Sequence, residues 1–287
     1  MIANNWGSFK ELDKTKHKKL HTKVKLGLPS ALRGIIWTRL SKSIDAVIPG
    51  KYNELLQQRT ANTNSNLCPI EKDSPRAFPY HPFFLNEGQT KLQNVLLAYA
   101  NRNPELGYMS GMHLITAILL FNMDEENAFW MLDTLMKDYQ IEGFFLGNRE
   151  ILINAMKQLS HYLENNIPEL WEHFVQIGIE TIHFAISWFL TLYSYIGDSG
   201  SFTMRVLDVF LYEGPSILFR VATAILKHSK AKLLTADFSE VLQHFHSLNE
   251  TLTPDTILSI AYKLPKTPII ERFYSSDVEL QLIMSKK

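Results

Sequence analysis

The chain has 287 residues, enough for one large domain or two smaller ones with a substantial core. Hydrophobic residues make up 46% of the chain and charged residues 20%, proportions that exclude intrinsic disorder. Lysine and arginine together number 29, as do aspartate and glutamate, so the formal net charge is zero. This balance does not favour binding to nucleic acid, and we expect no nucleic-acid partner. Cys68 is the single cysteine, which excludes an internal disulfide and fits a reducing, cytoplasmic compartment.

The first 26 residues form a basic lead-in with lysines at positions 10, 14, 16, 18, 19, 23 and 25. Such a run is typical of the solvated face of a helix, and contact with an acidic lipid surface is the sharper alternative. No signal peptide opens the chain, and the most apolar stretch, 184–196, is too short to span a bilayer. We expect that stretch to be a buried helix. We therefore expect a cytoplasmic protein without a transmembrane segment, with the basic N-terminus as the part suited to peripheral contact with endomembranes.

One stretch, from about 60 to 88, is rich in Asn, Pro and Ser, and we predict a long loop there. It contains Arg76 between Pro75 and Pro79, which limit backbone freedom on both sides. Asp73 lies three residues earlier, where a carboxylate can pair with the guanidinium or brace the loop. An isolated loop arginine is ordinarily just solvated. A long ordered loop in a helical domain is usually functional, and this one would present a side chain to a partner at a low ordering cost.

Helical periodicity dominates the rest of the chain. Apolar residues spaced three and four apart predict helices near 92–103, 128–139 and 151–165. Asp124 is placed to cap the second of these, and Asp237 and Glu240 have the spacing of a capping box. Few segments alternate apolar and polar residues for long enough to be strands. The sequence therefore predicts an all-α fold of roughly a dozen helices in two packed sub-bundles.

Other functional patterns are missing or incomplete. No Gly-x-x-x-x-Gly-Lys-Ser/Thr or Gly-x-Gly-x-x-Gly motif occurs, so we do not expect the chain to bind nucleotide by those routes. The turn at 197–200, Gly-Asp-Ser-Gly, resembles the nucleophile turn of trypsin-like proteases, but a polar turn between helices explains it. The histidine pairs have no cysteine or carboxylate set that would complete a tetrahedral site, and we expect no metal.

Three short motifs follow one another in order. They are Arg33-Gly34-Ile35-Ile36-Trp37, the set Ile70, Asp73 and Arg76, and Tyr108-Met109-Ser110. With further blocks at 87–108, 125–130, 187–193 and 206–215, they resemble the TBC-domain family of Rab GTPase-activating proteins. The resemblance spans 27–248. It leaves the basic lead-in, 1–26, on one side and a C-terminal helical appendage, 249–287, on the other.

The resemblance implies that Arg76 is an arginine finger, inserted in trans into a Rab-like small GTPase in its GTP form. GTP and Mg²⁺ would be carried by that partner, so no cofactor of the chain's own is expected. The resemblance further implies that Ile70, Asp73 and Tyr108 bind or shape the GTPase site, and that Arg33 and Trp37 support it from inside.

The family's third motif is Tyr-x-Gln, whose glutamine orients the attacking water, and here Ser110 stands at the glutamine position. A serine hydroxyl can donate and accept, but it has no amide and a much shorter reach. Water positioning would then fall to the GTPase's own glutamine. Two hypotheses therefore stay open. Arg76 favours a GTPase activator that acts in vesicle trafficking. Ser110 favours a weak or inactive TBC-fold module that binds a small GTPase or another partner as a scaffold.

Overall fold

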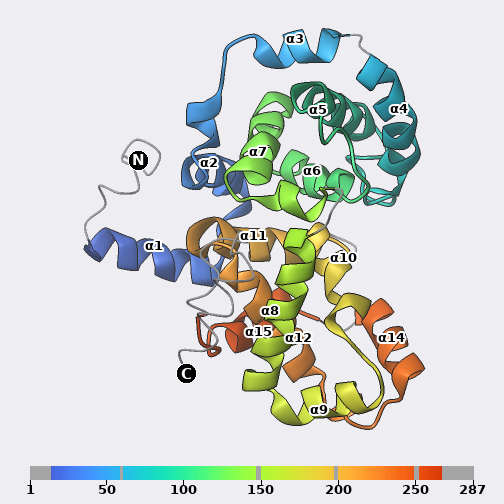
Figure 1. Cartoon of the computed structure of the whole chain (residues 1–287). Coiled ribbons are helices and arrows are strands. Elements are labelled where there is room, and N and C mark those ends of the chain that lie inside the picture. The colour runs from blue at the N-terminus through green and yellow to red at the C-terminus, as the bar shows by residue number, and fades with distance from the viewer. Residues whose placement is uncertain (1–13, 59–60, 147–149, 197–199, 249–251, 267–287) are drawn as a thin grey trace. The chain divides into compact units, whose positions relative to one another are not determined.

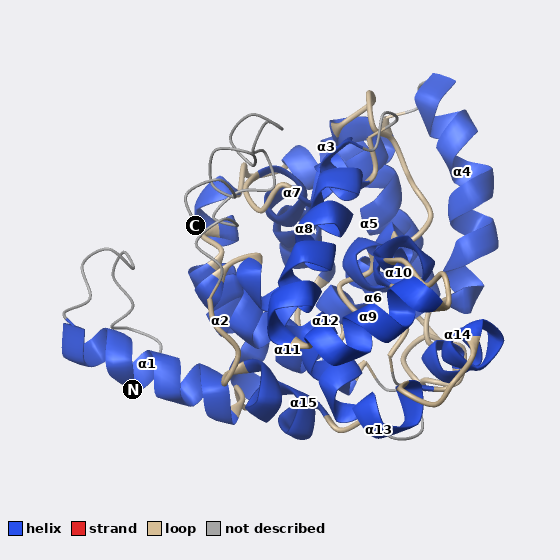
Figure 2. Ribbon diagram, turned by 60° about the horizontal axis from the view of Figure 1, so that its bottom comes forward, coloured by secondary structure: helices blue, strands red, loops and turns tan. Residues whose placement is uncertain are grey.

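The computed structural model describes residues 14–58, 61–146, 150–196, 200–248 and 252–266. Every regular element within these ranges is a helix, as Figure 2 shows, which confirms the all-α prediction. None of the helices in this part of the chain has the length and apolar character needed to cross a bilayer. Residues 197–199 of the predicted polar turn, the first half of the proposed lead-in (1–13) and most of the appendage fall outside the described residues.

The α-helices are labelled in Figure 1 and their bounds are, in chain order, α1 (Lys14–Leu26), α2 (Ser30–Leu40), α3 (Lys51–Gln57), α4 (Ala61–Asp73), α5 (Gly88–Arg102), α6 (Met112–Leu120), α7 (Glu125–Lys137), α8 (Glu150–Asn166), α9 (Pro168–Gln176), α10 (Ala185–Leu190), α11 (Ser201–Glu213), α12 (Ser216–His228), α13 (Lys230–Leu233), α14 (Phe238–His246) and α15 (Pro254–Ala261). Short 3₁₀ helices lie between them: η2 (Ser43–Ala46), η3 (Ser74–Arg76), η4 (Ile141–Phe144) and η5 (Thr181–His183).

The chain divides into two compact helical units, in agreement with the expected two sub-bundles. Unit 1 consists of residues up to 138 together with 207–212, and unit 2 consists of 139–206 and the residues from 213 onward. In unit 1, α5 packs against α6 and α7, and α3 and α4 pack against α5 from outside (Figure 1). In unit 2, α12 packs against α8 and α15. The candidate functional residues all belong to unit 1.

Local sequence signals fix several helix starts. The Asp124 carboxylate accepts a hydrogen bond from the Asn127 backbone N–H at 3.0 Å and caps α7. At α14 the Asp237 carboxylate accepts from the Glu240 N–H, and the Glu240 carboxylate accepts from the Asp237 N–H, both at 2.9 Å. These bonds satisfy donors that helix geometry leaves without an intrahelical partner. Both capping predictions are confirmed.

The helix α1 shows how the basic run is placed. Leu20 and Val24 are buried, while Lys19 and Lys23 are exposed. The ring of His21 stacks on Tyr212 with a centroid separation of 5.4 Å. One face of α1 therefore packs on unit 1, and the other presents lysines to solvent.

The prediction of a long loop from 60 to 88 is wrong for its first half. Residues 61–73 form α4, and η3 follows directly. Asn, Ser and Thr are weak helix formers and Pro69 lacks an N–H, so the local sequence argues against a helix. Packing overrides this preference, because α4 lies along α5 and Ile70 is fully buried. Arg76 therefore ends a helical segment, and only the part from Ala77 to Glu87 is irregular.

The expectation of one buried helix over 184–196 is also only partly right. The stretch is mostly buried, but the helix α10 covers only 185–190 of it. Leu192 and Tyr193 have φ values of 49° and 68°, in the left-handed region that side chains with a Cβ rarely adopt. The Tyr193 ring is fully buried, and its hydroxyl donates to the Leu218 carbonyl at 2.5 Å. Burial of this aromatic side chain offsets the strain of the turn.

Candidate functional site

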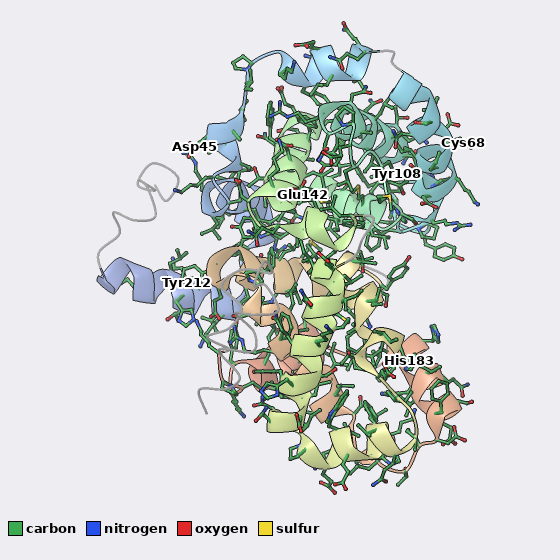
Figure 3. The ribbon with its side chains drawn as sticks, in the orientation of Figure 1. Asp45, Cys68, Tyr108, Glu142, His183 and Tyr212 are labelled. Carbon is green, nitrogen blue, oxygen red and sulfur yellow. The ribbon has the colours of Figure 1, made fainter. Side chains whose placement is uncertain are left out.

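Two of the candidate residues, Asp73 and Tyr108, meet although 35 positions separate them. Asp73 ends α4, Tyr108 lies in the turn before α6 (Figure 3), and the Tyr108 hydroxyl donates to Asp73 Oδ2 at 2.8 Å. The Tyr108 backbone N–H also donates to Asn66 Oδ1 of α4 at 2.6 Å. Because the two bonds involve different donors and different acceptors, they fix both the backbone and the ring of Tyr108 against α4.

Arg76 is exposed at the end of η3. Its side chain is 67% exposed, and Nη1 lies 3.9 Å from Asp73 Oδ1. Directly after it, Ala77 and Phe78 are buried. The backbone of Arg76 is thus anchored on both sides while its guanidinium remains in solvent. An exposed ion pair at this distance contributes little to stability, so Asp73 orients the guanidinium without holding it tightly.

Ser110 belongs to the same cluster. Its side chain is exposed, hydrogen-bonds to Asp73, and lies two residues before α6, whose residues are all buried. Burial acts to raise the pKa of Asp73, but the hydrogen bonds from Tyr108 and Ser110, with His113 and Arg76 nearby, outweigh it, and this pKa lies below its ordinary value. Asp73 is therefore a carboxylate at neutral pH. The structure thus brings Arg76, Tyr108 and Ser110 together around Asp73.

His113 is a member of this cluster that sequence analysis missed. It lies in the first turn of α6 and is 3% exposed, and its Nδ1 lies 3.0 Å from the Tyr108 hydroxyl oxygen. The Gly111 backbone N–H points at the same Nδ1 over 3.3 Å. Burial lowers the pKa of His113 below 6.5, and Arg76 lowers it further against the opposing effect of Asp73. One histidine in the largely apolar run 112–120 was the signal that could have pointed to it.

Ile70 supports the cluster from the protein interior. It is fully buried, and its backbone carbonyl accepts a hydrogen bond from the Ser74 hydroxyl at 2.6 Å. Ser74 begins η3, so this bond ties the turn that carries Arg76 to the end of α4. The burial of Ile70 places it as a support for that turn and leaves it no surface for a partner.

Arg33 and Trp37 gather around a second carboxylate of unit 1, Asp208 of α11. Asp208 Oδ1 accepts from Arg33 Nε at 3.1 Å and from Trp37 Nε1 at 2.9 Å, and Oδ2 accepts from the Leu28 backbone N–H at 3.1 Å. Burial raises the pKa of Asp208, although Arg33 and these three bonds oppose it. Arg33 is 8% exposed and Trp37 is fully buried. Sequence analysis missed Asp208, for which one carboxylate in the apolar run 206–210 was the signal.

The chemistry available at the Asp73 cluster is that of a presented cation. A guanidinium is always charged, and its planar fork matches phosphate or carboxylate oxygens. In the described parts of the chain, no group of three or more His, Cys, Asp or Glu side chains is placed to hold a metal ion. Arg76 can therefore offer a positive charge to an anion on another molecule, with Asp73 as its resting partner.

Comparison with known proteins shows which family this chain resembles. The model of the Rab-GTPase-TBC domain matches residues 30–234. The chain is 32% identical, over 92% of its length, to the human ecotropic viral integration site 5 protein homolog, and 35% identical, over 84%, to the GTPase-activating protein GYP5 of Eremothecium gossypii. It is 33% identical, over 77% of its length, to the Rab GTPase-activating protein eat-17 of Caenorhabditis elegans. These matches cover 32%, 28% and 25% of the three relatives, so the chain spans about a quarter to a third of their length.

Two solved structures have the same fold. The crystal structure of the Chlamydomonas flagellar RabGAP TBC domain is similar with a TM-score of 0.77 and 29% identity, over 88% of this chain and 86% of that one. The Ypt/Rab-GAP domain of Gyp1p is similar with a TM-score of 0.71, over 88% of this chain and 94% of that one. At 23% identity, the second likeness concerns the fold alone.

Proposed function

The chain belongs to the Rab-GTPase-TBC domain family, and we propose that it is a GTPase-activating protein for a Rab-like small GTPase in its GTP form, with Arg76 as an arginine finger supplied in trans. The observation that carries the proposal is the exposed guanidinium of Arg76, 67% exposed and 3.9 Å from the anchored Asp73 carboxylate. GTP and Mg²⁺ belong to the partner, and the chain contributes no cofactor. The proposal places the protein in the cytoplasm, with the exposed Lys19 and Lys23 of α1 available for peripheral contact with an acidic endomembrane.

The chemical role of Arg76 follows from the demands of phosphoryl transfer. Negative charge spreads over the oxygens of the transferred phosphoryl group, and a positive group aimed at them lowers the barrier. An arginine supplied in trans accelerates hydrolysis by about 10³ to 10⁵, which corresponds to roughly 4 to 7 kcal/mol of barrier.

The contact between Arg76 and Asp73 suits an arginine that must leave its ion pair to enter the GTPase site. Asp73 holds the guanidinium near one orientation, since Tyr108 and Ser110 fix the carboxylate. The pair is long and its guanidinium is exposed, so breaking it on binding costs about 1 kcal/mol or less. The fixed backbone limits the ordering cost that a freely moving loop would add.

Ser110 decides which of the two proteins positions the attacking water. Its hydroxyl is engaged by Asp73 and is too short to take over the task of a glutamine amide. The attacking water is therefore positioned by the GTPase's own glutamine. Replacing that glutamine by leucine should abolish stimulation by the wild-type protein, and Ser110→Gln should restore part of it. Strong stimulation of the leucine GTPase by the wild-type protein would contradict this division.

A second candidate function rests on the same serine. A TBC-fold module that binds a GTPase without accelerating hydrolysis needs no second finger, and Ser110 fits that description. Asp73, Tyr108 and the exposed arginine would then form only a docking surface.

A panel of GTP-loaded Rab GTPases separates the two functions. Phosphate release would be followed under single-turnover conditions with the wild-type chain in excess, and binding of each GTPase would be measured in parallel with a non-hydrolysable GTP analogue. We expect at least one GTPase to be stimulated by about 10³ or more. Binding without stimulation across the panel would instead establish the binding module.

A further inference from the structure

The hydrogens of the Asp73 cluster can be placed from its distances. The Tyr108 hydroxyl has one proton and lies 2.8 Å from Asp73 Oδ2 and 3.0 Å from His113 Nδ1. Asp73 is ionised and has no proton to give, so the tyrosine proton goes to the carboxylate, which makes the shorter and charge-assisted bond. The lone pairs of the tyrosine oxygen then face His113.

Two tautomers of His113 compete for this position. With the proton on Nδ1, the imidazole donates to Tyr108 over 3.0 Å and continues a chain that ends on a carboxylate. The Gly111 N–H then faces the Nδ1 proton, with the two nitrogens 3.3 Å apart. With the proton on Nε2, Nδ1 accepts from the Gly111 N–H over 3.3 Å, but its lone pair then faces the lone pairs of the Tyr108 oxygen at 3.0 Å. Each tautomer thus gains one bond and meets one repulsion. The first gains the shorter bond and meets its repulsion over the longer distance, so it is the stable one.

We infer that His113 is a positioning residue for Arg76. Its Nδ1–H donates to the Tyr108 hydroxyl, which directs the hydroxyl proton to Asp73 and thereby fixes the carboxylate that orients the guanidinium. His113 is 3% exposed and offers almost no surface to a GTPase, so its effect on Arg76 runs through Tyr108 and Asp73. The catalytic consequence rests on the proposed arginine-finger function, whereas the direction of the hydrogen bonds does not.

Substitutions at His113 separate donation from packing. Asparagine carries its side-chain nitrogen the same number of bonds from the backbone as Nδ1, so His113→Asn can keep the donation to Tyr108. His113→Leu keeps an apolar bulk of similar size and removes the donor. We expect His113→Leu to lower the maximal stimulated rate of hydrolysis by about tenfold, the scale of one lost hydrogen bond, without weakening GTPase binding. His113→Asn should stay within about threefold of the wild-type rate.

A double-mutant comparison tests the route through Tyr108. In a Tyr108→Phe background, where the link to Asp73 is missing, His113→Leu should have no further effect on the rate. A packing role would instead lower stability and activity by the same factor in both backgrounds, and that result would overturn the inference.

The tautomer can be measured without any GTPase. Ring ¹⁵N chemical shifts of the free protein report which imidazole nitrogen carries the proton, and the His113 signals are those that disappear in His113→Asn. Nδ1–H at neutral pH supports the inference, and Nε2–H overturns it. No stimulation of any GTPase by the wild-type chain would overturn the proposed function, so the two failures are distinguishable.

Discussion

Unit 1 contains two aspartates that each face an arginine, and the two pairs differ in where the guanidinium lies. Around Asp208 the guanidinium of Arg33 is buried, and every bond to the carboxylate described above comes from a buried donor. Around Asp73 the guanidinium of Arg76 is 67% exposed. The pKa shifts have opposite signs, since burial raises the pKa of Asp208 while bonded donors lower that of Asp73.

This difference decides what each pair can do. Removing one partner of a buried pair leaves an uncompensated charge inside the protein and costs about 3 to 5 kcal/mol. An exposed pair contributes about 0 to 1 kcal/mol, so its arginine can move to another anion at little expense to the fold. The Asp208 pair thus stabilises the packing of α2 on α11, whereas the Asp73 pair leaves Arg76 able to bind another anion.

The largest effect should follow from removing the exposed arginine. Arg76→Ala should lower stimulated GTP hydrolysis by about 10³ or more, because no other group replaces its charge at the transferring phosphoryl oxygens. Arg76→Lys should also fail, since a point charge cannot reproduce the planar fork. Single-turnover phosphate release measures the rate, and urea unfolding should show a stability change within about 0.5 kcal/mol.

The matched control is Arg39→Ala, which removes another exposed arginine of unit 1, on α2. It should leave both the rate and the stability near the wild-type values. Most of the stimulation surviving in either Arg76 variant would remove Arg76 from the catalytic role.

The buried arginine should show the reverse pattern. Arg33→Ala should destabilise the protein by about 3 to 5 kcal/mol, because it leaves Asp208 buried without its cation. Replacing both partners, with Arg33→Met and Asp208→Leu, should cost less, since no charge is then stranded. Urea unfolding measures these changes, and stimulation per folded molecule should be unaltered. A loss of activity in fully folded Arg33→Ala would break the distinction between the two pairs.

A smaller effect should appear in the dependence of stability on pH. The pKa of His113 is lowered in the folded state, so below pH 6.5 the unfolded chain binds more protons and stability falls as the pH drops toward the folded pKa. The charged or titratable groups facing His113 are Tyr108, Asp73 and Arg76. The pKa of His244 in unit 2 is also lowered by burial and contributes in the same direction.

The difference between the wild type and His113→Asn isolates this residue. The variant should lose less stability than the wild type as the pH falls below 6.5, as measured by urea unfolding at a series of pH values. The contribution of Asp73 lies in another window, because its pKa is lowered from 3.8 and its stabilisation is lost only as the pH falls below that value. Parallel stability curves for the two proteins as the pH falls below 6.5 would contradict the shift of His113, since both would then titrate alike.

Local signals in the sequence were enough to predict much of the fold. Asp124 and Asp237 cap their helices through partners three residues away, and the helix that begins at Gly88 ends at Arg102, close to the predicted end at 103. The resemblance to the TBC-domain family, which rests on motif order, also assigned Asp73, Arg76 and Tyr108 to one site. These features depend on neighbours in sequence or on motif order, which can be seen without a structure.

The features that could not be predicted depend on long-range packing. The segment 61–73 is helical only because α5 provides a surface for Ile70. Asp208 lies 175 residues from Arg33, and no spacing rule connects them. His113 joins the cluster through the turn that brings Tyr108 to α4, so in the sequence it is only a lone histidine in an apolar run.

The same isosteric change at the two aspartates tests the central claim most directly. Asp208→Asn places an amide donor among the buried donors of Arg33, Trp37 and Leu28, and should lower the free energy of unfolding by about 3 kcal/mol. Asp73→Asn keeps an acceptor for Tyr108, should cost about 1 kcal/mol or less, and should lower stimulated hydrolysis by about tenfold or more. Urea unfolding and single-turnover phosphate release on both variants give the four values. The account predicts a stable but poorly active Asp73→Asn and an unstable Asp208→Asn with normal activity per folded molecule, and the reverse pattern would contradict it.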